Sequence, residues 1–261
     1  MGPPLKKPPV YFTVVQVRFN PVLKLTDYLP SIQESLRKFG FPAYTQRTTI
    51  AVQLVAKDGQ ALPEPVPRAQ YLFGNVEQTH SFVLGPDSLT FQSTNYGTYE
   101  TFSDAFVEGL ALVHKEVRLD FTDRIGLRYL DHVFPEAGDS LQQYLAPEVQ
   151  GLSGRLGGRP VHSFSEALNA VNEVMLRARV VIQEGGLGFP PDLIPQGMEV
   201  QRRFLQSQGM HAILDTDGYV EGRALFSLEN VRQNLTAIHA VISAAFKATV
   251  TDHARAVWNE E

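Results

Sequence analysis

The sequence predicts an α+β fold of two similar subdomains, each a mainly antiparallel sheet with helices covering one face. Three observations support this. Apolar residues alternate with period two in many short runs, turn-forming residues separate the runs, and both halves follow the order strand, helix, several strands, helix. We place the boundary between residues 1–122 and 123–261 and expect the two to pack closely as one unit. With 261 residues, 43% of them hydrophobic, the chain can bury a sizeable core.

The chain is expected to open with a strand followed by a helix. Val10–Asn20 alternates between an apolar face and a mixed face, and Pro21 ends the strand. Thr26-Asp27 has the residue types of a helix N-cap, and apolar residues then follow at helical spacing until Gly40. Pro30 falls in the first turn, where proline is tolerated.

A meander of short strands is expected between residues 44 and 96. The predicted strands are Thr48–Ala56, Gln70–Glu77, His80–Leu84 and Leu89–Ser93, with turns at Asp58-Gly59, Gly85-Pro86-Asp87-Ser88 and Asn95-Tyr96-Gly97. Pro63, Pro65 and Pro67 indicate an exposed connection rather than a strand. Thr98 then has the residue type of an N-cap for a second helix that reaches about Glu116.

The second half repeats the order of elements. The predicted elements are a strand over Arg124–Phe134, a short helix over Asp139–Ala146, strands over Val171–Gln183 and Met210–Tyr219, and a long helix from Ser227 with a last turn reaching Trp258. Ala167–Ala178 fits either a helix or a strand. Two long loops rich in Gly and Pro are Gly151–Pro160 and Gly185–Gly197. Such loops either carry a binding site or have no role in binding.

Composition excludes several classes of protein. The chain has no cysteine, which rules out disulfides, cysteine-ligated zinc, iron–sulfur clusters and thiol nucleophiles. No stretch approaches the ~18 uncharged apolar residues of a membrane helix. Lys6-Lys7 is followed by two prolines and a strand, not by the apolar core of a secretory signal. We therefore expect a cytoplasmic protein that does not enter a membrane and has no cofactor.

The charge balance disfavours nucleic acid as a partner. The net charge is −5, with 11 basic and 11 acidic residues up to Thr122 and 12 basic against 17 acidic residues from Asp123 onward. Domains that grip nucleic acid through phosphates usually carry a basic excess, because counterion release supplies most of the affinity. A local cluster of arginines would be needed instead.

The most distinctive string is Arg124-Ile-Gly-Leu-Arg-Tyr-Leu-Asp-His132. In a strand, Arg124, Arg128 and His132 share one face, while Tyr129 points to the other with Ile125 and Leu127. Two guanidinium groups flanking Gly126 could receive a carboxylate or phosphate. The alternative, which we favour, is that both arginines pair with acidic side chains of a neighbouring strand.

The second string is His211-Ala-Ile-Leu-Asp-Thr-Asp217. Period two places His211, Asp215 and Asp217 on one face, where an imidazole and two carboxylates could share a divalent cation. The same acids could instead neutralise Arg124 or Arg128 on another strand. The central geometric prediction is thus that the arginine-bearing and aspartate-bearing strands are neighbours.

The other candidates for catalysis are weaker. His239 borders the apolar stripe of the long helix, and the adjacent Asp252 and His253 would not face each other on a helix. The sequence contains no G-x-S-x-G elbow, no G-x-x-x-x-G-K-[ST] phosphate loop and no H-E-x-x-H pair. Catalysis is therefore not the favoured hypothesis.

Several segments together resemble a sporadically distributed bacterial family of uncharacterised proteins. They are Arg18-Phe19-Asn20-Pro21, Tyr96–Phe106, Arg124–Tyr129 with its R-I-G-L-R-Y signature, Leu214–Asp217 and His239–Asp252. The resemblance spans nearly the whole chain and implies no assigned activity or catalytic residues. The patchy occurrence of the family implies genes that travel, as accessory, defence or toxin-linked components do.

We expect a non-catalytic binding or assembly component that binds a protein partner or associates with itself. The first alternative is a metal-dependent hydrolase, with a nuclease as one form of it, that uses His211, Asp215 and Asp217. The second is a binder of an anionic small molecule or RNA through Arg124 and Arg128, with Tyr129 and His132 nearby.

Overall fold

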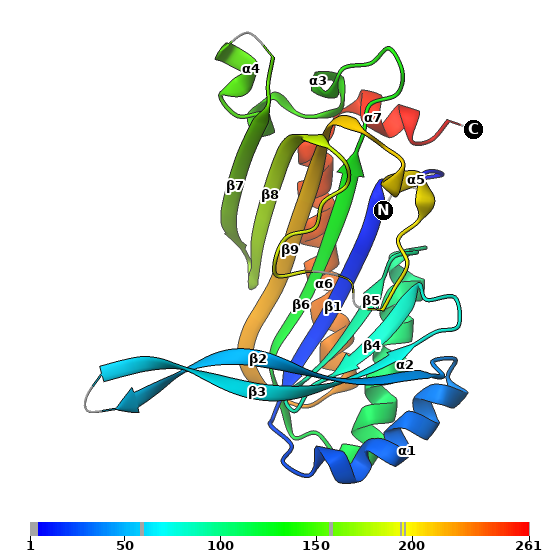
Figure 1. Cartoon of the computed structure of the whole chain (residues 1–261), viewed down its shortest axis with the longest axis vertical. Helices are drawn as coiled ribbons and strands as arrows, with labels where there is room; N and C mark the ends of the chain where they lie inside the picture. Colours follow the sequence, from blue (N-terminus) through cyan, green and yellow to red (C-terminus); the bar gives the residue numbers. More distant parts are fainter. Residues whose placement is uncertain (1–4, 58–59, 157–158, 194, 196, 261) are drawn as a thin grey trace.

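In the described part of the chain, nine strands form one antiparallel sheet (Figure 1), in the order β2-β3-β4-β5-β1-β6-β9-β8-β7. The computed structural model describes residues 5–57, 60–156, 159–193, 195 and 197–260. The strands are β1 (Val10–Phe19), β2 (Ala43–Lys57), β3 (Gln60–Gly74), β4 (His80–Leu84), β5 (Ser88–Ser93), β6 (Phe121–Val133), β7 (His162–Val171), β8 (Val174–Gly185) and β9 (Gly209–Leu225). The α+β class predicted from the sequence is confirmed.

The long helices among the described residues are α1 (Leu25–Lys38), α2 (Tyr99–Val117) and α6 (Leu228–Thr249). The short ones are α3 (Leu141–Tyr144), the 3-10 turn η1 (Pro147–Val149), α4 (Ser153–Leu156), α5 (Arg202–Leu205) and α7 (Asp252–Val257). Thr98 caps α2 as predicted, and Ser227 caps α6. Each side chain accepts a hydrogen bond from a backbone N–H of the first turn. None of the described helices is both long and apolar enough to cross a membrane.

The two halves of the chain share one sheet and do not form two separate ones. β1 lies between β5 and β6 and pairs with both. Its register with β6 runs from Val10 opposite Asp131 to Phe19 opposite Thr122. The order of elements does repeat. β2 to β5 form a meander that returns to β1, and β7 to β9 form a second meander that returns to β6. The division into two subdomains is therefore not confirmed.

The main core lies between the sheet and the helices α1, α2 and α6, which cover one face (Figure 1). α6 buries Val231, Leu235, Ile238 and Ile242, the apolar stripe seen in the sequence. The helix approaches β9 closely at Gly218, where a Cβ atom would stand 2.8 Å from Ile238 Cγ2. A smaller cluster joins α3 and α7 to the end of the sheet, around Tyr144 and Trp258.

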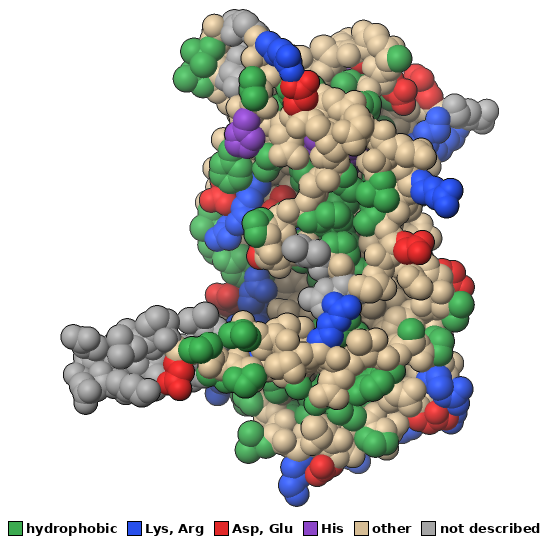
Figure 2. Space-filling view, in the orientation of Figure 1, with side chains coloured by type: hydrophobic (Ala, Val, Ile, Leu, Met, Phe, Trp, Pro, Cys, Tyr) green, Lys and Arg blue, Asp and Glu red, His purple; other side chains and the backbone are tan. Residues whose placement is uncertain are grey.

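The opposite face is partly covered by the segment 186–208, which links β8 to β9 and contains α5 (Figure 1). Phe189 and Phe204 of this segment pack on Tyr11 and Phe12 of β1. The Tyr11 hydroxyl donates to the carbonyl of Gly188 at 2.8 Å. Hydrophobic side chains gather where the segment crosses the sheet (Figure 2). The predicted loop Gly185–Gly197 is thus part of the packing on this face.

The prediction that Pro63, Pro65 and Pro67 form a connection is wrong, because all three lie within β3. β3 pairs with β2 along its whole length but with β4 only over Tyr71–Gly74. The backbone N–H groups of alternate residues point to the same side of a strand, so prolines spaced by two can leave the side facing β2 intact. The β2–β3 hairpin consequently extends beyond the rest of the sheet (Figure 1). The predicted turn at Asp58-Gly59 lies outside the described residues.

Other boundaries also differ from expectation. α1 begins at Leu25 after Lys24, so Pro30 lies inside the helix and not in its first turn. The ambiguous segment Ala167–Ala178 forms the facing parts of β7 and β8, joined at Asn172-Glu173. Asn172 adopts a left-handed backbone (φ 54°), which asparagine tolerates better than most residues.

Candidate ligand-binding pocket

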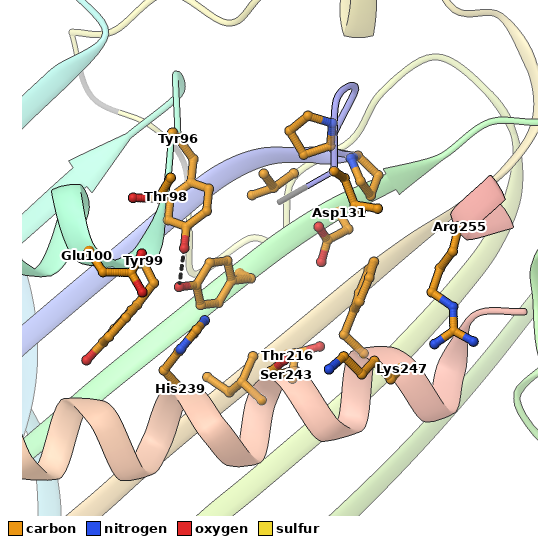
Figure 3. A pocket seen from close by; sticks show the side chains of 18 of the residues that line it. Tyr96, Thr98, Tyr99, Glu100, Asp131, Thr216, His239, Ser243, Lys247 and Arg255 are labelled. Atoms are coloured by element: carbon orange, nitrogen blue, oxygen red, sulfur yellow. Dashed lines mark hydrogen bonds between the residues drawn. The ribbon is translucent and has the colours of Figure 1, made fainter. Parts of the chain in front are cut away.

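A pocket of about 530 Å³ lies on the helix side of the sheet, between β6, β9 and α6 (Figure 3). Its rim is formed by the start of α2, the N-terminal segment before β1, and α7. The polar lining groups come from Tyr96, Thr98, Tyr99, Glu100, Tyr129, Asp131, Thr216, His239, Ser243, Lys247, Arg255 and Asn259. The volume lies within the ~300–1,000 Å³ range of small-molecule sites.

Secondary-structure periodicity aims these side chains into the pocket. Tyr129 and Asp131 lie two residues apart on β6 and share its helix-side face, and Thr216 of β9 stands opposite Tyr129. His239, Ser243 and Lys247 recur every fourth residue along α6 and therefore line one side of that helix.

Backbone hydrogen bonds fix the rim of the pocket. The N-terminal segment is tied to α7 by the Lys7 N–H, which donates to the carbonyl of Trp258 at 2.9 Å. The same segment is tied to the sheet by the His132 N–H, which donates to the carbonyl of Pro9 at 2.9 Å. The position of Tyr99 follows from the N-cap at Thr98, whose hydroxyl accepts from the Thr101 N–H at 3.2 Å.

Asp131 is the most unusual group in the pocket. It is 6% exposed, and among the described residues its carboxylate makes no hydrogen bond or ion pair. Burial alone raises its pKa from the ordinary 3.8 to about 7. A buried carboxylate normally has a cation or several donors. Asp131 therefore has unused capacity to accept hydrogen bonds from a molecule that enters the pocket (Figure 3).

Two tyrosine hydroxyls line the same pocket. Tyr96 Oη and Tyr129 Oη are 3.0 Å apart, so one donates to the other (Figure 3). Burial is the main reason that the pKa of each tyrosine is raised, and the charge of Asp131 raises both further. Both hydroxyls therefore keep their protons at neutral pH. The second O–H of the pair has no other acceptor among the described residues.

His239 of α6 lines the pocket next to Tyr99 and Tyr129. Its ring stacks on Tyr99 with centroids 3.9 Å apart and planes inclined by 2°. Burial lowers the pKa of His239, and Lys247 lowers it further while Glu100 opposes the shift, so the imidazole is neutral at pH 7. Its Nδ1 is buried without a hydrogen-bond partner in the described part of the chain. The sequence prediction of a histidine bordering the apolar stripe is correct, but the residue also faces the pocket.

The predicted neighbours, the arginine-bearing and aspartate-bearing strands, are adjacent as β6 and β9. Arg128 donates from Nε to Asp215 Oδ1 at 2.6 Å and from a terminal nitrogen to Asp215 Oδ2 at 2.8 Å. It also bonds Asp192 of the segment 186–208 at 2.7 Å. Arg179 of β8 donates to Asp215 at 3.1 Å and to Glu166 of β7 at 2.6 Å. These side chains form an ion-pair network on the face opposite the pocket.

The other residues predicted with Arg128 lie in different surroundings. Arg124 lies over the ring of Tyr219, 4.4 Å from its centroid, and is 3.3 Å from Glu221. The buried His132 packs among aromatic rings, and burial lowers its pKa to about 4. Tyr129 alone of the four points into the pocket. The structure thus does not gather Arg124, Arg128, His132 and Tyr129 into one site.

The three residues suggested for a metal are also separate in their contacts. His211 is fully buried, with Nδ1 3.0 Å from the Gly209 carbonyl and Nε2 3.4 Å from the side chain of Gln183. Asp215 is occupied by Arg128 and Arg179, while Asp217 stands opposite Arg128 and Arg177 in the sheet. Within the described ranges, no group of three or more His, Asp or Glu residues is arranged to hold a metal ion.

Sequence reasoning did not single out Asp131, although the residue lies in the distinctive string. A signal was present. Ile125, Leu127 and Tyr129 define the apolar face of β6, and Asp131 is the next residue on that face. An acid that continues an apolar face is out of pattern, and such buried acids often mark functional sites.

Comparison of the chain with known protein families and with curated proteins finds no match.

Proposed function

We propose that the protein binds a small organic molecule in the pocket between β6, β9 and α6. The observation that carries this proposal is Asp131, a buried carboxylate that faces the pocket and has no partner among the described residues. A largely apolar pocket with a few convergent polar groups and a perturbed acid is the usual form of a ligand site.

This proposal gives a specific form to the expectation of a binding component. The role of the protein as an assembly partner, its self-association and its place in a mobile gene cassette stay predictions. So does anion or RNA binding at Arg124 and Arg128. An anion at Arg128 would have to displace Asp192, because the guanidinium already bonds two carboxylates.

A thermal-shift screen with a matched pair of variants tests the proposal. Ser243→Phe places a large side chain in the pocket, whereas Ala244→Phe places the same side chain on the exposed side of α6. A library of small amines, alcohols, acids and aromatic heterocycles is screened for compounds that raise the Tm. A ligand that binds only the folded state stabilises it.

We expect some compounds to raise the Tm of the wild type and of Ala244→Phe but not of Ser243→Phe. The proposal is wrong if every stabilising compound acts equally on both variants.

A further inference from the structure

We propose that the ligand of this pocket carries a protonated amine that pairs with Asp131, attached to an apolar body that fills the rest of the cavity. This inference rests on the proposed function and names the chemical class of the ligand.

The first argument concerns hydrogen-bonding capacity. An ionised carboxylate accepts several hydrogen bonds and donates none, whereas an ammonium group offers three donors and a positive charge. No described residue supplies either to Asp131. A bound ammonium would compensate the buried charge and donate to it, which neither an alcohol nor an anion can do.

The second argument concerns the neighbouring aromatic rings. Tyr96 and Tyr129 meet edge to face, with centroids 5.2 Å apart, and the ring of His239 lies 6.2 Å from that of Tyr129 (Figure 3). Tyrosine faces attract cations, and the attraction grows when the cation is removed from water. The aromatic rings of the pocket and the Asp131 carboxylate thus both favour a positively charged ligand.

The third argument concerns the other charged and titratable groups that line the pocket. They are Tyr129 on β6, Tyr96 before α2, Tyr99 and Glu100 at the start of α2, His239 and Lys247 on α6, and Arg255 on α7. Tyr96, Tyr129 and His239 are neutral at pH 7. Arg255 forms an ion pair with Asp252, and Lys247 is exposed. Neither cation contributes to the pKa of Asp131, which burial alone sets.

Three probes with one carbon skeleton separate the possible ligand classes. 3-Phenylpropylamine is the cation, 3-phenylpropanol the neutral analogue and 3-phenylpropanoate the anion. Binding is measured at pH 8 by chemical-shift titration of the ¹⁵N-labelled protein, for the wild type and for Asp131→Asn. Glu108→Gln is the matched control, because it removes an exposed carboxylate of α2 that does not line the pocket.

We expect the amine to bind the wild type about tenfold or more tightly than the alcohol, and the propanoate to bind most weakly. Asp131→Asn should remove the preference for the amine, while Glu108→Gln should retain it. Amine affinity should also fall as the pH is lowered from 8 to 5.5, because Asp131 takes up a proton, and the alcohol should show no such fall.

Equal binding of amine and alcohol to the wild type would overturn the inference, and this comparison needs no variant. If that equal binding is still blocked by Ser243→Phe, the pocket remains a ligand site and only the amine class is wrong. If no probe at millimolar concentration distinguishes the wild type from Ser243→Phe, both the inference and the proposed function fail.

Discussion

Arg128 and Asp215 lie diagonally across the β6–β9 pair, and the guanidinium of Arg128 donates to both oxygens of the carboxylate, at 2.6 and 2.8 Å. The side chain of Arg128 is 10% exposed and that of Asp215 is 3% exposed. Such a bidentate pair is strong, and its loss would leave a charge buried in the sheet.

Arg128→Met should lower the free energy of unfolding by about 3–5 kcal/mol, because Arg179 is then the one ion-pair partner left to Asp215 among the described residues. Urea denaturation of the variant measures this change. Arg223→Met, which breaks the exposed pair with Asp123, is the control and should cost no more than about 1 kcal/mol. Equal losses for the two variants would contradict a structural role for the Arg128 pair.

Asp131→Asn should make the protein more stable than the wild type above about pH 7, by roughly 4 kcal/mol at most. The folded-state pKa of Asp131, about 7, exceeds its ordinary value of 3.8, so the folded protein holds the proton more tightly. Stability from this group is therefore complete below about pH 4 and is lost as the pH rises to 7.

Urea denaturation of both proteins from pH 4.5 to 8 gives the difference in the free energy of unfolding between Asp131→Asn and the wild type. A difference that does not change with pH would show that the carboxylate is hydrated or paired in solution.

Gly109→Ala should lower the Tm even though alanine is the better helix former by about 1 kcal/mol. Gly109 lies on the buried side of α2, where an added Cβ would overlap the ring of Phe82 in the core. Overpacking of this kind costs about 1–3 kcal/mol. Gly97→Ala meets no atom within 4 Å and should leave the Tm unchanged. Calorimetry of both variants makes the comparison, and an unchanged Tm for Gly109→Ala would mean that α2 shifts freely.

Asp192→Asn should loosen the segment 186–208 without unfolding the protein. Asp192 is 63% exposed and bonds Arg128 at 2.7 Å, which lowers the pKa of its carboxyl. Its contribution to stability is present above its ordinary pKa and is lost as the pH falls. Hydrogen exchange should therefore quicken within the segment and stay unchanged in β6 and β9. Faster exchange throughout the sheet would contradict a local role.

Much of the fold follows from local patterns. The stripe of α6, the N-caps at Thr98 and Ser227 and the alternation in β6 each depend on residues close together in the chain. The pairing of β1 with β6, which joins the two meanders into one sheet, does not follow from local patterns. Pairing partners are chosen by packing across more than a hundred residues, which period two cannot encode.

The sequence could predict that ion pairs form between these strands, because opposite charges on neighbouring strands stabilise each other. Arg128 and Asp215 were both predicted members, and Asp192 was missed because it comes from a loop. The pocket was not predicted. Its walls come from β6, β9, α6 and the chain before β1, and nothing local relates these segments.

The central position of β1 also bears on how the chain matures during synthesis. β1 leaves the ribosome about a hundred residues before its partner β6, and α6 follows later still. Until β6 is made, one edge of β1 has no strand to pair with, and an unpaired edge can pair with other chains and cause aggregation. We expect the protein to fold slowly, because its native contacts join segments that are far apart in the chain. We also expect a chaperone to assist the nascent chain until α6 docks on the sheet.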